Sequence, residues 1–208
     1  VDVFTRRTVT PGMTTAVLIM LDRSGSMVDA VSIAGQPVTR LDACMGTLAI
    51  MLPALDRAGA ESAATAFFGN TSVDGIHEDT LHPLTTWGGK ANPDAFLTRW
   101  ASVAPGAGTP MVREARYAQR ELMARRVERR VCLWLCDGLP NGGRWGGAQA
   151  VATELATQRR QGVEHYGIGI QADLSMVFSP DHSVSVMDLA ALPKAVEAML
   201  TRGADRHA

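Results

Sequence analysis

The sequence predicts an α/β protein with a Rossmann-like, doubly wound sheet of six mostly parallel strands, one antiparallel edge strand and helices on both faces. Two continuous apolar runs of strand length, residues 15–21 and 131–136, favour this fold, because strands buried on both faces do not alternate apolar with polar residues. Segments with apolar residues at helical spacing follow these strands. The 208 residues, 46% of them hydrophobic, suffice for one domain with a sizeable core.

The expected domain covers residues 15–202. Residues 1–14 read as an N-terminal arm with turn signals, and residues 203–208 read as a tail that we expect to be disordered. The sequence contains no internal repeat or low-complexity tract.

The first half of the domain alternates strand and helix signals. In order, we expect a strand at 15–21, an insertion at 28–39, a helix from about 40 to 58 and a strand at 63–68. The Gly69-Asn70 pair predicts a turn, after which residues 71–76 return as the antiparallel edge strand.

The second half opens with a long, weakly periodic segment, residues 77–110, in which Asn92-Pro93 predicts the start of a short helix that ends near residue 101. The later elements follow in order: a helix at 112–126, the strand at 131–136, a helix at 148–160, a strand at 163–170, an irregular connection at 172–182, a strand at 184–187 and a helix at 189–201. Gly167 and Gly169 thin the strand at 163–170, which predicts close packing against it.

Composition argues against several classes of protein. A net charge of −1 gives no basis for nucleic-acid or membrane-surface binding, and no run reaches the ~18 apolar residues of a transmembrane helix. The first residues lack the pattern of a signal peptide. Cys132 and Cys136 are expected to pack as small apolar residues on one strand face, with zinc binding or a disulfide as the alternatives. We therefore expect a cytoplasmic protein.

Three oxygen-bearing side chains follow the first strand at alternate positions: Asp22, Ser24 and Ser26. The carboxyl ends of parallel strands are where open α/β sheets bind ligands, and side chains spaced in this way can converge on one point. Clusters of oxygen ligands suit a hard cation such as Mg²⁺. The alternative is that these residues only form a turn and cap the next helix.

Two further segments favour the metal site. Thr109 lies in a Gly/Pro-rich loop that leads into a helix, and Asp137-Gly138 ends the strand at 131–136. An Asp-x-Ser-x-Ser motif, a loop threonine and a strand-terminal Asp-Gly, in that order, resemble the metal-ion-dependent adhesion site (MIDAS) of von Willebrand factor A (VWA) domains. The resemblance covers nearly the whole chain.

The resemblance implies a VWA fold and a divalent-metal-dependent protein-binding function. It implies that Mg²⁺, or Mn²⁺ or Ca²⁺ in its place, is bound by Asp22, Ser24, Ser26, Thr109 and Asp137, with at least one aspartate acting through water. Direct ligands that are mostly neutral hydroxyls leave the cation electrophilic. An Asp or Glu of a protein partner can then become its last ligand, which is a binding mechanism and not a catalytic one.

Residues around the expected site are candidates for partner binding. Trp87 and Trp145 lie in Gly-rich loops, whereas packed core tryptophans come mostly from strands and helices, and Arg144 adjoins Trp145. The alternative is that each tryptophan only covers its own loop.

Several segments resemble one VWA subfamily more closely. Residues 108–111, 125–131, 136–140 and 166–170 look like the C-terminal domain of the CobT subunit of cobaltochelatase. That likeness implies an adaptor subunit that works beside an AAA+ ATPase. The alternative is a stand-alone adhesion or assembly module without an ATPase partner. A neighbouring ATPase gene would favour the adaptor, and a secretion or pilus operon would favour the module.

An enzymatic function finds little support. A phosphatase would need a second acid close to its nucleophilic aspartate, and Asp22-x-Ser lacks one. The sequence has no Gly-x-Ser-x-Gly of a serine hydrolase and no Gly-x-x-x-x-Gly-Lys phosphate loop. We expect no catalytic activity of the chain alone, and a Mg²⁺-dependent hydrolase is the less favoured alternative.

Overall fold

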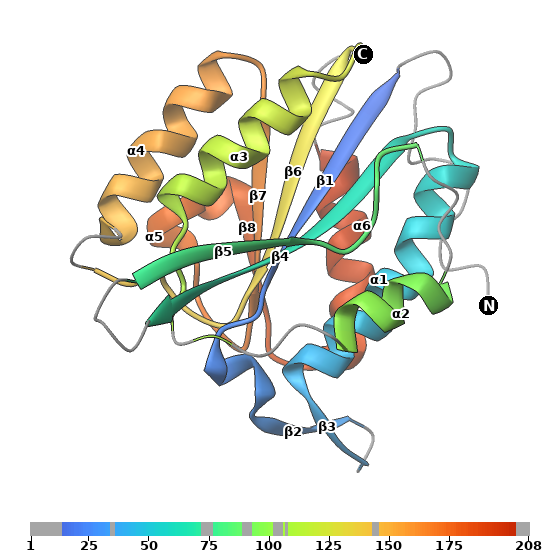
Figure 1. Cartoon of the computed structure of the whole chain (residues 1–208), viewed down its shortest axis with the longest axis vertical. Helices are drawn as coiled ribbons and strands as arrows, with labels where there is room; N and C mark the ends of the chain where they lie inside the picture. Colours follow the sequence, from blue (N-terminus) through green and yellow to red (C-terminus); the bar gives the residue numbers. More distant parts are fainter. Residues whose placement is uncertain are drawn as a thin grey trace.

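A computed structural model describes residues 14–33, 36–71, 77–88, 93–101, 106, 108–142 and 146–202. Its centre is a six-stranded sheet with the order β5-β4-β1-β6-β7-β8 (Figure 1). The strands are β1 (Thr15–Asp22), β4 (Glu61–Thr71), β5 (His77–Pro83), β6 (Arg129–Cys136), β7 (Glu164–Ile170) and β8 (Ser183–Val186). All neighbours pair in parallel except β4 and β5, which confirms the mostly parallel sheet with one antiparallel edge strand.

Strand β1 lies at the middle of the sheet and positions the rest. All eight of its residues are buried, and it pairs with β4 on one side and β6 on the other. Each buried Leu or Ile side chain stabilises the fold by roughly 1.5–3 kcal/mol relative to an exposed one. The apolar run of β1 therefore anchors Asp22, its last residue, at the edge of the sheet.

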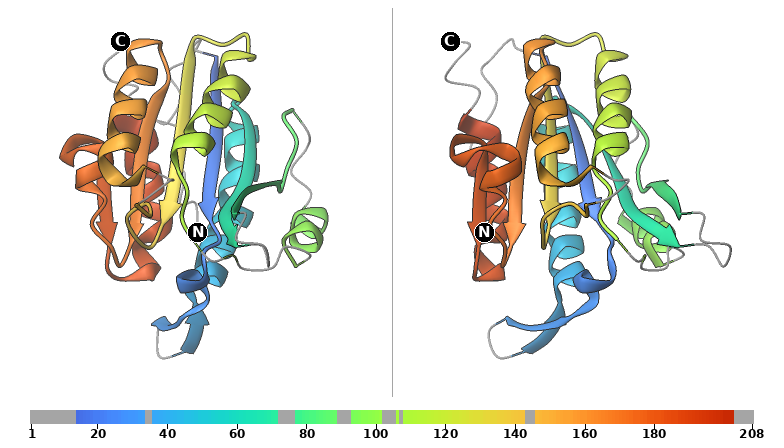
Figure 2. Two further views of the ribbon diagram at one scale, coloured as in Figure 1. Left: turned by 60° about the vertical axis from the view of Figure 1, so that its left-hand side comes forward. Right: turned by 90° about the vertical axis from the view of Figure 1, so that its left-hand side faces the viewer.

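Helices cover both faces of the sheet, as Figures 1 and 2 show. On one face lie α1 (Arg40–Arg57), α2 (Pro93–Ala101) and α6 (Leu192–Arg202), whose buried side chains form one core with Val17, Ile19 and Leu21. On the other lie α3 (Val112–Met123), α4 (Gly147–Arg160) and α5 (Ser175–Phe178), packed on Leu18 and Met20. The doubly wound arrangement predicted from the sequence is confirmed.

The insertion at 28–39 forms a β-hairpin of its own. A 3₁₀ helix η1 (Gly25–Val28) leads from β1 into β2 (Ala30–Ile33), which pairs with β3 (Gln36–Thr39). The hairpin projects from the body of the domain beyond the carboxyl end of β1 (Figures 1 and 2). Thr39 then caps α1 through a reciprocal pair of hydrogen bonds with Asp42, which fixes the start of that helix.

The edge strand was predicted in the wrong place. Gly69 and Asn70 do not form a turn: they belong to β4 and pair with Asp79 and Glu78. The return strand β5 begins at His77, inside the segment that was expected to be weakly periodic, and residues 72–76 lie outside the described ranges. Pairing with β4 thus overrode the local turn signal.

Two other expectations are corrected near the carboxyl end. The connection at 172–182 is not irregular throughout, because it contains α5 and a 3₁₀ helix, η3 (Pro180–His182). The last predicted helix is divided into η4 (Leu189–Ala191) and α6. Pro193 explains the division, since proline fits the first turn of a helix but cannot donate a hydrogen bond to a preceding turn. The predicted tail, and the arm up to residue 13, lie outside the described ranges.

The glycines of β7 admit close neighbours, as predicted. A Cβ at Gly167 would lie 2.4 Å from the Phe178 ring, and one at Gly169 would lie 2.0 Å from the carbonyl oxygen of Ala172. The cysteines Cys44, Cys132 and Cys136 are all free and buried, so they pack as small apolar residues. None of the helices in the described part of the chain is long and apolar enough to cross a membrane.

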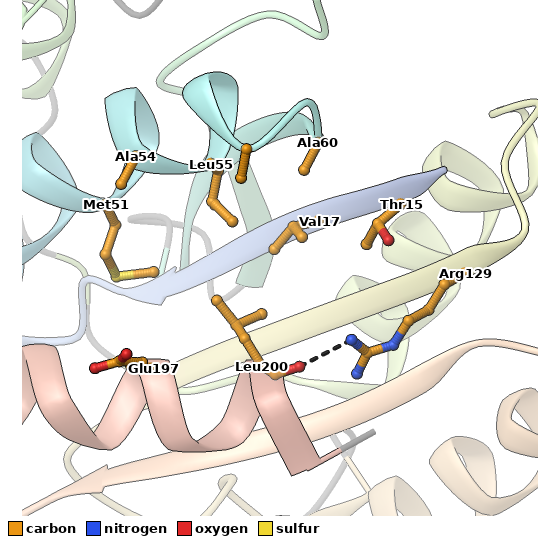
Figure 3. Close-up of a pocket in the computed structure, with 10 residues that line it drawn as sticks. Thr15, Val17, Met51, Ala54, Leu55, Ala60, Arg129, Glu197 and Leu200 are labelled. Carbon is orange, nitrogen blue, oxygen red and sulfur yellow. Dashed lines mark hydrogen bonds between the residues drawn. The ribbon is translucent and has the colours of Figure 1, made fainter. Parts of the chain in front are cut away.

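A small cavity lies at the amino-terminal end of the sheet, between α1 and α6 (Figure 3). Its volume is about 40 Å³, and its wall includes Thr15 at the start of β1 and Arg129 at the start of β6. Arg129 donates a 2.8 Å hydrogen bond to the carbonyl of Leu200 there, as the dashed line in Figure 3 marks. Because β1 and β6 are parallel, this cavity at their first residues lies at the opposite end of the sheet from Asp22 and Asp137.

Candidate metal centre

Three loops meet at the carboxyl ends of β1 and β6. The first runs from Asp22, the last residue of β1, through the turn that carries Ser24 and Ser26. The second holds Thr109 just before α3, and the third holds Asp137 just after β6. The structure therefore brings the five predicted site residues to one edge of the sheet.

Hydrogen bonds join all five residues into one cluster. Asp22 accepts a bond from the backbone N–H of Ser24 at Oδ1 (2.7 Å) and one from the Thr109 hydroxyl at Oδ2 (3.3 Å). The Ser26 hydroxyl donates to Oδ1 of Asp137 (2.9 Å) and lies 3.2 Å from the Ser24 hydroxyl. The five side chains therefore lie in one hydrogen-bonded cluster, and their binding of a metal stays a prediction.

The two carboxylates lie where negative charge is costly. Asp22 is fully buried, and the side chain of Asp137 is 3% exposed. Burial raises the pKa of Asp22 to about 7, and the nearby charge of Asp137 adds to the rise. Burial also raises the pKa of Asp137, against the lowering effects of its hydrogen bond from Ser26 and of Arg40. A bound cation would stabilise both carboxylates in their charged form.

The donor set fits a hard divalent cation. The cluster offers carboxylate and hydroxyl oxygens, which are the ligands that Mg²⁺, Mn²⁺ and Ca²⁺ prefer. Within the described ranges, no group of three or more His, Cys, Asp or Glu side chains is arranged to hold a metal. The present cluster is of a different kind, because only two of its five members, Asp22 and Asp137, belong to these residue types. Burial raises the pKa of the Cys44 and Cys136 thiols well above its usual range, and the charges of Asp22 and Asp137 add to the rise.

Arg40 is a component of this centre that the sequence did not predict. Its guanidinium Nη1 lies 3.5 Å from Oδ2 of Asp137 and donates a 2.8 Å hydrogen bond to the carbonyl of Ser26. Arg40 is the first residue of α1, and the hairpin that separates it from Ser26 was read only as an insertion. No signal in the sequence placed its side chain beside Asp137.

Two other residues hold the loops in place and were also missed. Asn141 accepts a hydrogen bond from the backbone N–H of Thr109 through Oδ1, and its own N–H donates to the Thr109 carbonyl (3.1 Å). Arg23 stacks its guanidinium 4.0 Å from the centre of the Trp100 ring and donates to the Trp100 carbonyl (3.0 Å). Asparagine in a Pro-Asn-Gly turn is a signal that could have identified the first of these.

The contacts of Trp87 fit the alternative in which it covers its own loop. Its indole N–H donates a 2.9 Å hydrogen bond to Glu121, and the Arg125 guanidinium lies 5.2 Å from the ring centre. Both partners belong to α3 or the turn after it, so Trp87 packs its own loop against that helix. Arg144 and Trp145 lie outside the described residues, and partner binding by all three stays a prediction.

No family model matches this sequence, and no curated protein matches it either. Solved structures do match. The chain is similar to the pilus adhesin SpaC from Lactobacillus rhamnosus GG, with 17% identity and a TM-score of 0.64 over 95% of this chain and 31% of the adhesin. It is also similar to proximal thread matrix protein 1 from the mussel byssus, in a structure with a zinc-occupied MIDAS motif, with 15% identity and a TM-score of 0.64 over 92% of this chain and 46% of that one.

A third match is a single domain. The SpRpn10 VWA domain shares 16% identity with a TM-score of 0.59, over 87% of this chain and 93% of that domain. By contrast, the chain spans about a third of the adhesin and about half of the mussel protein. Identities this low show the fold alone, and that fold agrees with the strand order, the helices on both faces and the antiparallel edge strand. This chain has the fold of a von Willebrand factor A domain.

Proposed function

We propose that the chain is a divalent-cation-dependent protein-binding domain. Asp22, Ser24, Ser26, Thr109 and Asp137 hold the cation, Mg²⁺ or in its place Mn²⁺ or Ca²⁺, and an Asp or Glu of a partner completes the site. One observation carries the proposal: two buried carboxylates and three hydroxyls form a single hydrogen-bonded cluster at the carboxyl edge of the sheet.

Each residue has a distinct part in this function. Ser24, Ser26 and Thr109 offer neutral hydroxyl oxygens, whereas Asp22 and Asp137 supply negative charge. Asp22 also orients two of the other residues, because it accepts hydrogen bonds from the Ser24 backbone and the Thr109 hydroxyl. Two carboxylates nearly neutralise a divalent cation, but a cation whose direct ligands are mostly neutral hydroxyls stays electrophilic and can take a carboxylate from outside as its last ligand.

The surroundings of the centre suit a protein partner. Val28, in the turn after Ser26, is 42% exposed, and Leu139, two residues after Asp137, is 41% exposed. Large exposed apolar side chains next to a charged centre are a common feature of interfaces, in which apolar contact supplies affinity and the charged group supplies specificity. We expect the partner's acidic residue to be flanked by apolar ones.

The solved structures support this proposal in one respect. The mussel protein of the same fold has a MIDAS motif occupied by zinc, so a metal site of this kind occurs on this fold. The adhesin shows the fold within a protein named for adhesion. Neither fixes the metal or the partner of the present chain.

The finer proposal is an adaptor that works beside an AAA+ ATPase in the cytoplasm, as in CobT-type cobaltochelatase. Its support is the likeness of residues 108–111 and 136–140, which carry Thr109 and Asp137, to that subfamily. The alternative is a stand-alone adhesion or assembly module. Capture of an AAA+ ATPase from the native host, lost on adding EDTA, would favour the adaptor.

Binding of Mn²⁺, measured by calorimetry on chelator-treated protein, tests the shared part of both proposals. We expect one Mn²⁺ per chain in the wild type and none in Asp22→Asn, which keeps the side-chain shape but removes the charge. Competition with Mg²⁺, Ca²⁺ and Zn²⁺ then ranks the cations. Binding that persists in Asp22→Asn would place the metal elsewhere.

A further inference from the structure

Arg40 lies between the candidate metal centre and the base of the hairpin formed by β2 and β3. Its Nη1 donates to the carbonyl of Ser26 (2.8 Å) and to Oδ2 of Asp29 (3.2 Å), and lies 3.5 Å from Oδ2 of Asp137. Its Nε donates to the side-chain oxygen of Gln171 (3.1 Å). The side chain is 20% exposed, so the guanidinium forms part of the wall of the centre.

Contacts other than the one with Asp137 keep the guanidinium in this position. Ser26 belongs to the turn after β1, Asp29 precedes the hairpin, and Gln171 follows β7. Gln171 adopts a left-handed backbone conformation, with φ of 56°, which is uncommon for a residue other than glycine. Acceptors on three segments therefore hold Arg40, and arrival of a cation beside Asp137 would not release it.

The start of α1 does not need this positive charge. The amino terminus of a helix carries a partial positive charge, so a cation there is unfavourable, and α1 is 18 residues long. Thr39 and Asp42 already cap the helix reciprocally. The positive charge of Arg40 beside Asp137 is therefore not explained by the needs of the helix.

We propose that Arg40 acts as a built-in cation of the metal centre and lowers the affinity of that centre for divalent cations. Its guanidinium offsets part of the negative charge of Asp137 and repels a second positive charge at short range. This inference rests on the proposed function, because it assumes that the cluster around Asp22 binds the cation. Arg40 is thereby a residue that sets affinity and not a ligand.

The test compares Mn²⁺ affinity, measured by calorimetry, among charge-removing and charge-keeping variants. Arg40→Gln removes the charge, and we expect the dissociation constant to fall about tenfold or more. Arg40→Lys keeps the charge, and its dissociation constant should lie near that of the wild type. Arg116→Gln is the matched control: Arg116 also donates to a carboxylate, that of Glu154 (3.0 Å), but on the outer surface of α3 and α4, and its loss should leave Mn²⁺ affinity unchanged.

A structural role for Arg40 gives the opposite sign. If the guanidinium mainly supports Ser26 and Asp137, Arg40→Gln binds Mn²⁺ more weakly or unchanged, and the inference is overturned while the proposed function stands. Arg40→Met, which keeps the aliphatic stem, replaces Arg40→Gln if circular dichroism shows that the latter does not fold. Mn²⁺ binding that is detected in Arg40→Gln but not in the wild type, and that is lost when Asp22→Asn is added to Arg40→Gln, would support the inference. No binding by the wild type or by either charge-removing variant would overturn the proposed function and the inference with it.

Discussion

The Ser26 hydroxyl donates a 2.9 Å hydrogen bond to Oδ1 of Asp137, although 111 residues separate them in the sequence. The bond depends on strand register, because β1 and β6 are parallel neighbours in which Leu21 pairs with Leu135. Both strands therefore end at the same height, and the residues that follow them meet. The candidate metal centre is thus a consequence of how the sheet pairs.

Thr109→Ala should weaken cation binding without unfolding the domain. The change removes a hydroxyl that lies 3.3 Å from Oδ2 of Asp22, but little buried volume. We expect Mn²⁺ affinity to fall about tenfold, with the free energy of unfolding in urea changed by less than about 1 kcal/mol. Thr153→Ala on α4, whose hydroxyl donates only to the Gln149 carbonyl, is the control that should alter neither quantity by much. Equal Mn²⁺ affinity in Thr109→Ala and wild type would exclude Thr109 as a ligand.

His165 should make the domain less stable in acid. Burial lowers the pKa of His165 to about 3 in the folded chain, where its Nδ1 accepts a 3.2 Å hydrogen bond from the Trp134 indole. Unfolded histidine has a pKa of about 6.5, so the unfolded state binds a proton that the folded state excludes. The contribution of His165 to the free energy of unfolding is therefore complete above pH ~6.5 and is lost as the pH falls toward ~3. The free energy of unfolding changes by at most about 1.4 kcal/mol per pH unit through this residue.

His165→Gln isolates this effect, since glutamine can still accept from Trp134 but does not titrate. Urea unfolding from pH 7 to 4, on chelator-treated protein, should show a wild-type-minus-variant difference that shrinks as the pH falls. The comparison with the variant is necessary because Asp22 also titrates in this range. Its pKa is raised to about 7 in the folded chain, so a fall in pH below 7 stabilises the folded state through Asp22, whereas it destabilises that state through His165. Parallel curves for the two proteins would contradict the assignment to His165.

Two glycine substitutions should change stability in opposite directions. A Cβ at Gly169 would lie 2.0 Å from the Ala172 carbonyl oxygen, so Gly169→Ala must displace backbone and should destabilise the domain by about 2 kcal/mol or more. Gly46, on the exposed side of α1, has open space around it, and alanine there should stabilise by about 0.5–1 kcal/mol. Thermal unfolding of both variants provides the measurement. A melting temperature of Gly169→Ala at or above that of the wild type would contradict the close packing at Ala172, and a lowered one in Gly46→Ala would contradict the open space around Gly46.

The purified chain should hydrolyse neither ATP nor simple phosphate esters. The sequence lacks the phosphate-binding loop of nucleotide hydrolases, and Ser24 stands two positions after Asp22, where a phosphatase would need a second acid. Phosphate release with Mg²⁺ present is the measurement. Turnover that survives purification and disappears in Asp137→Ala would instead make the centre a hydrolase site.

The sequence could predict the sheet and the five clustered residues because both follow from short-range patterns. An apolar run that ends in Asp22 predicts a buried strand, and it also predicts that Asp22 lies at the carboxyl end of that strand, where open α/β sheets bind ligands. The apolar run before Asp137 predicts the same for Asp137. Parallel pairing then brings the two ends together without any need to know the loops. Thr109 was chosen because the order of the three segments resembles the MIDAS motif, and the structure places its hydroxyl 3.3 Å from Oδ2 of Asp22.

Arg40 and β5 could not be predicted because long-range contacts decide them. The guanidinium of Arg40 reaches Asp137 because β2 and β3 pair with each other and bring the start of α1 back to the end of β1. Likewise β4 continues through Gly69 and Asn70, where local turn preference argued for a break, because β5 pairs with it there. Propensity is a weak guide where tertiary pairing competes with it.

The most direct test of the central claim is the thermal unfolding of chelator-treated protein with and without Mn²⁺, in the wild type and in Asp22→Asn. At about 100 times the dissociation constant, a cation bound only by the folded chain stabilises it by about 2.7 kcal/mol, which should raise the melting temperature of the wild type by about 5–10 °C. The Asp22→Asn variant should fold and show no rise. A wild-type melting temperature indifferent to Mn²⁺, or an equal rise in the variant, would contradict a metal centre at Asp22.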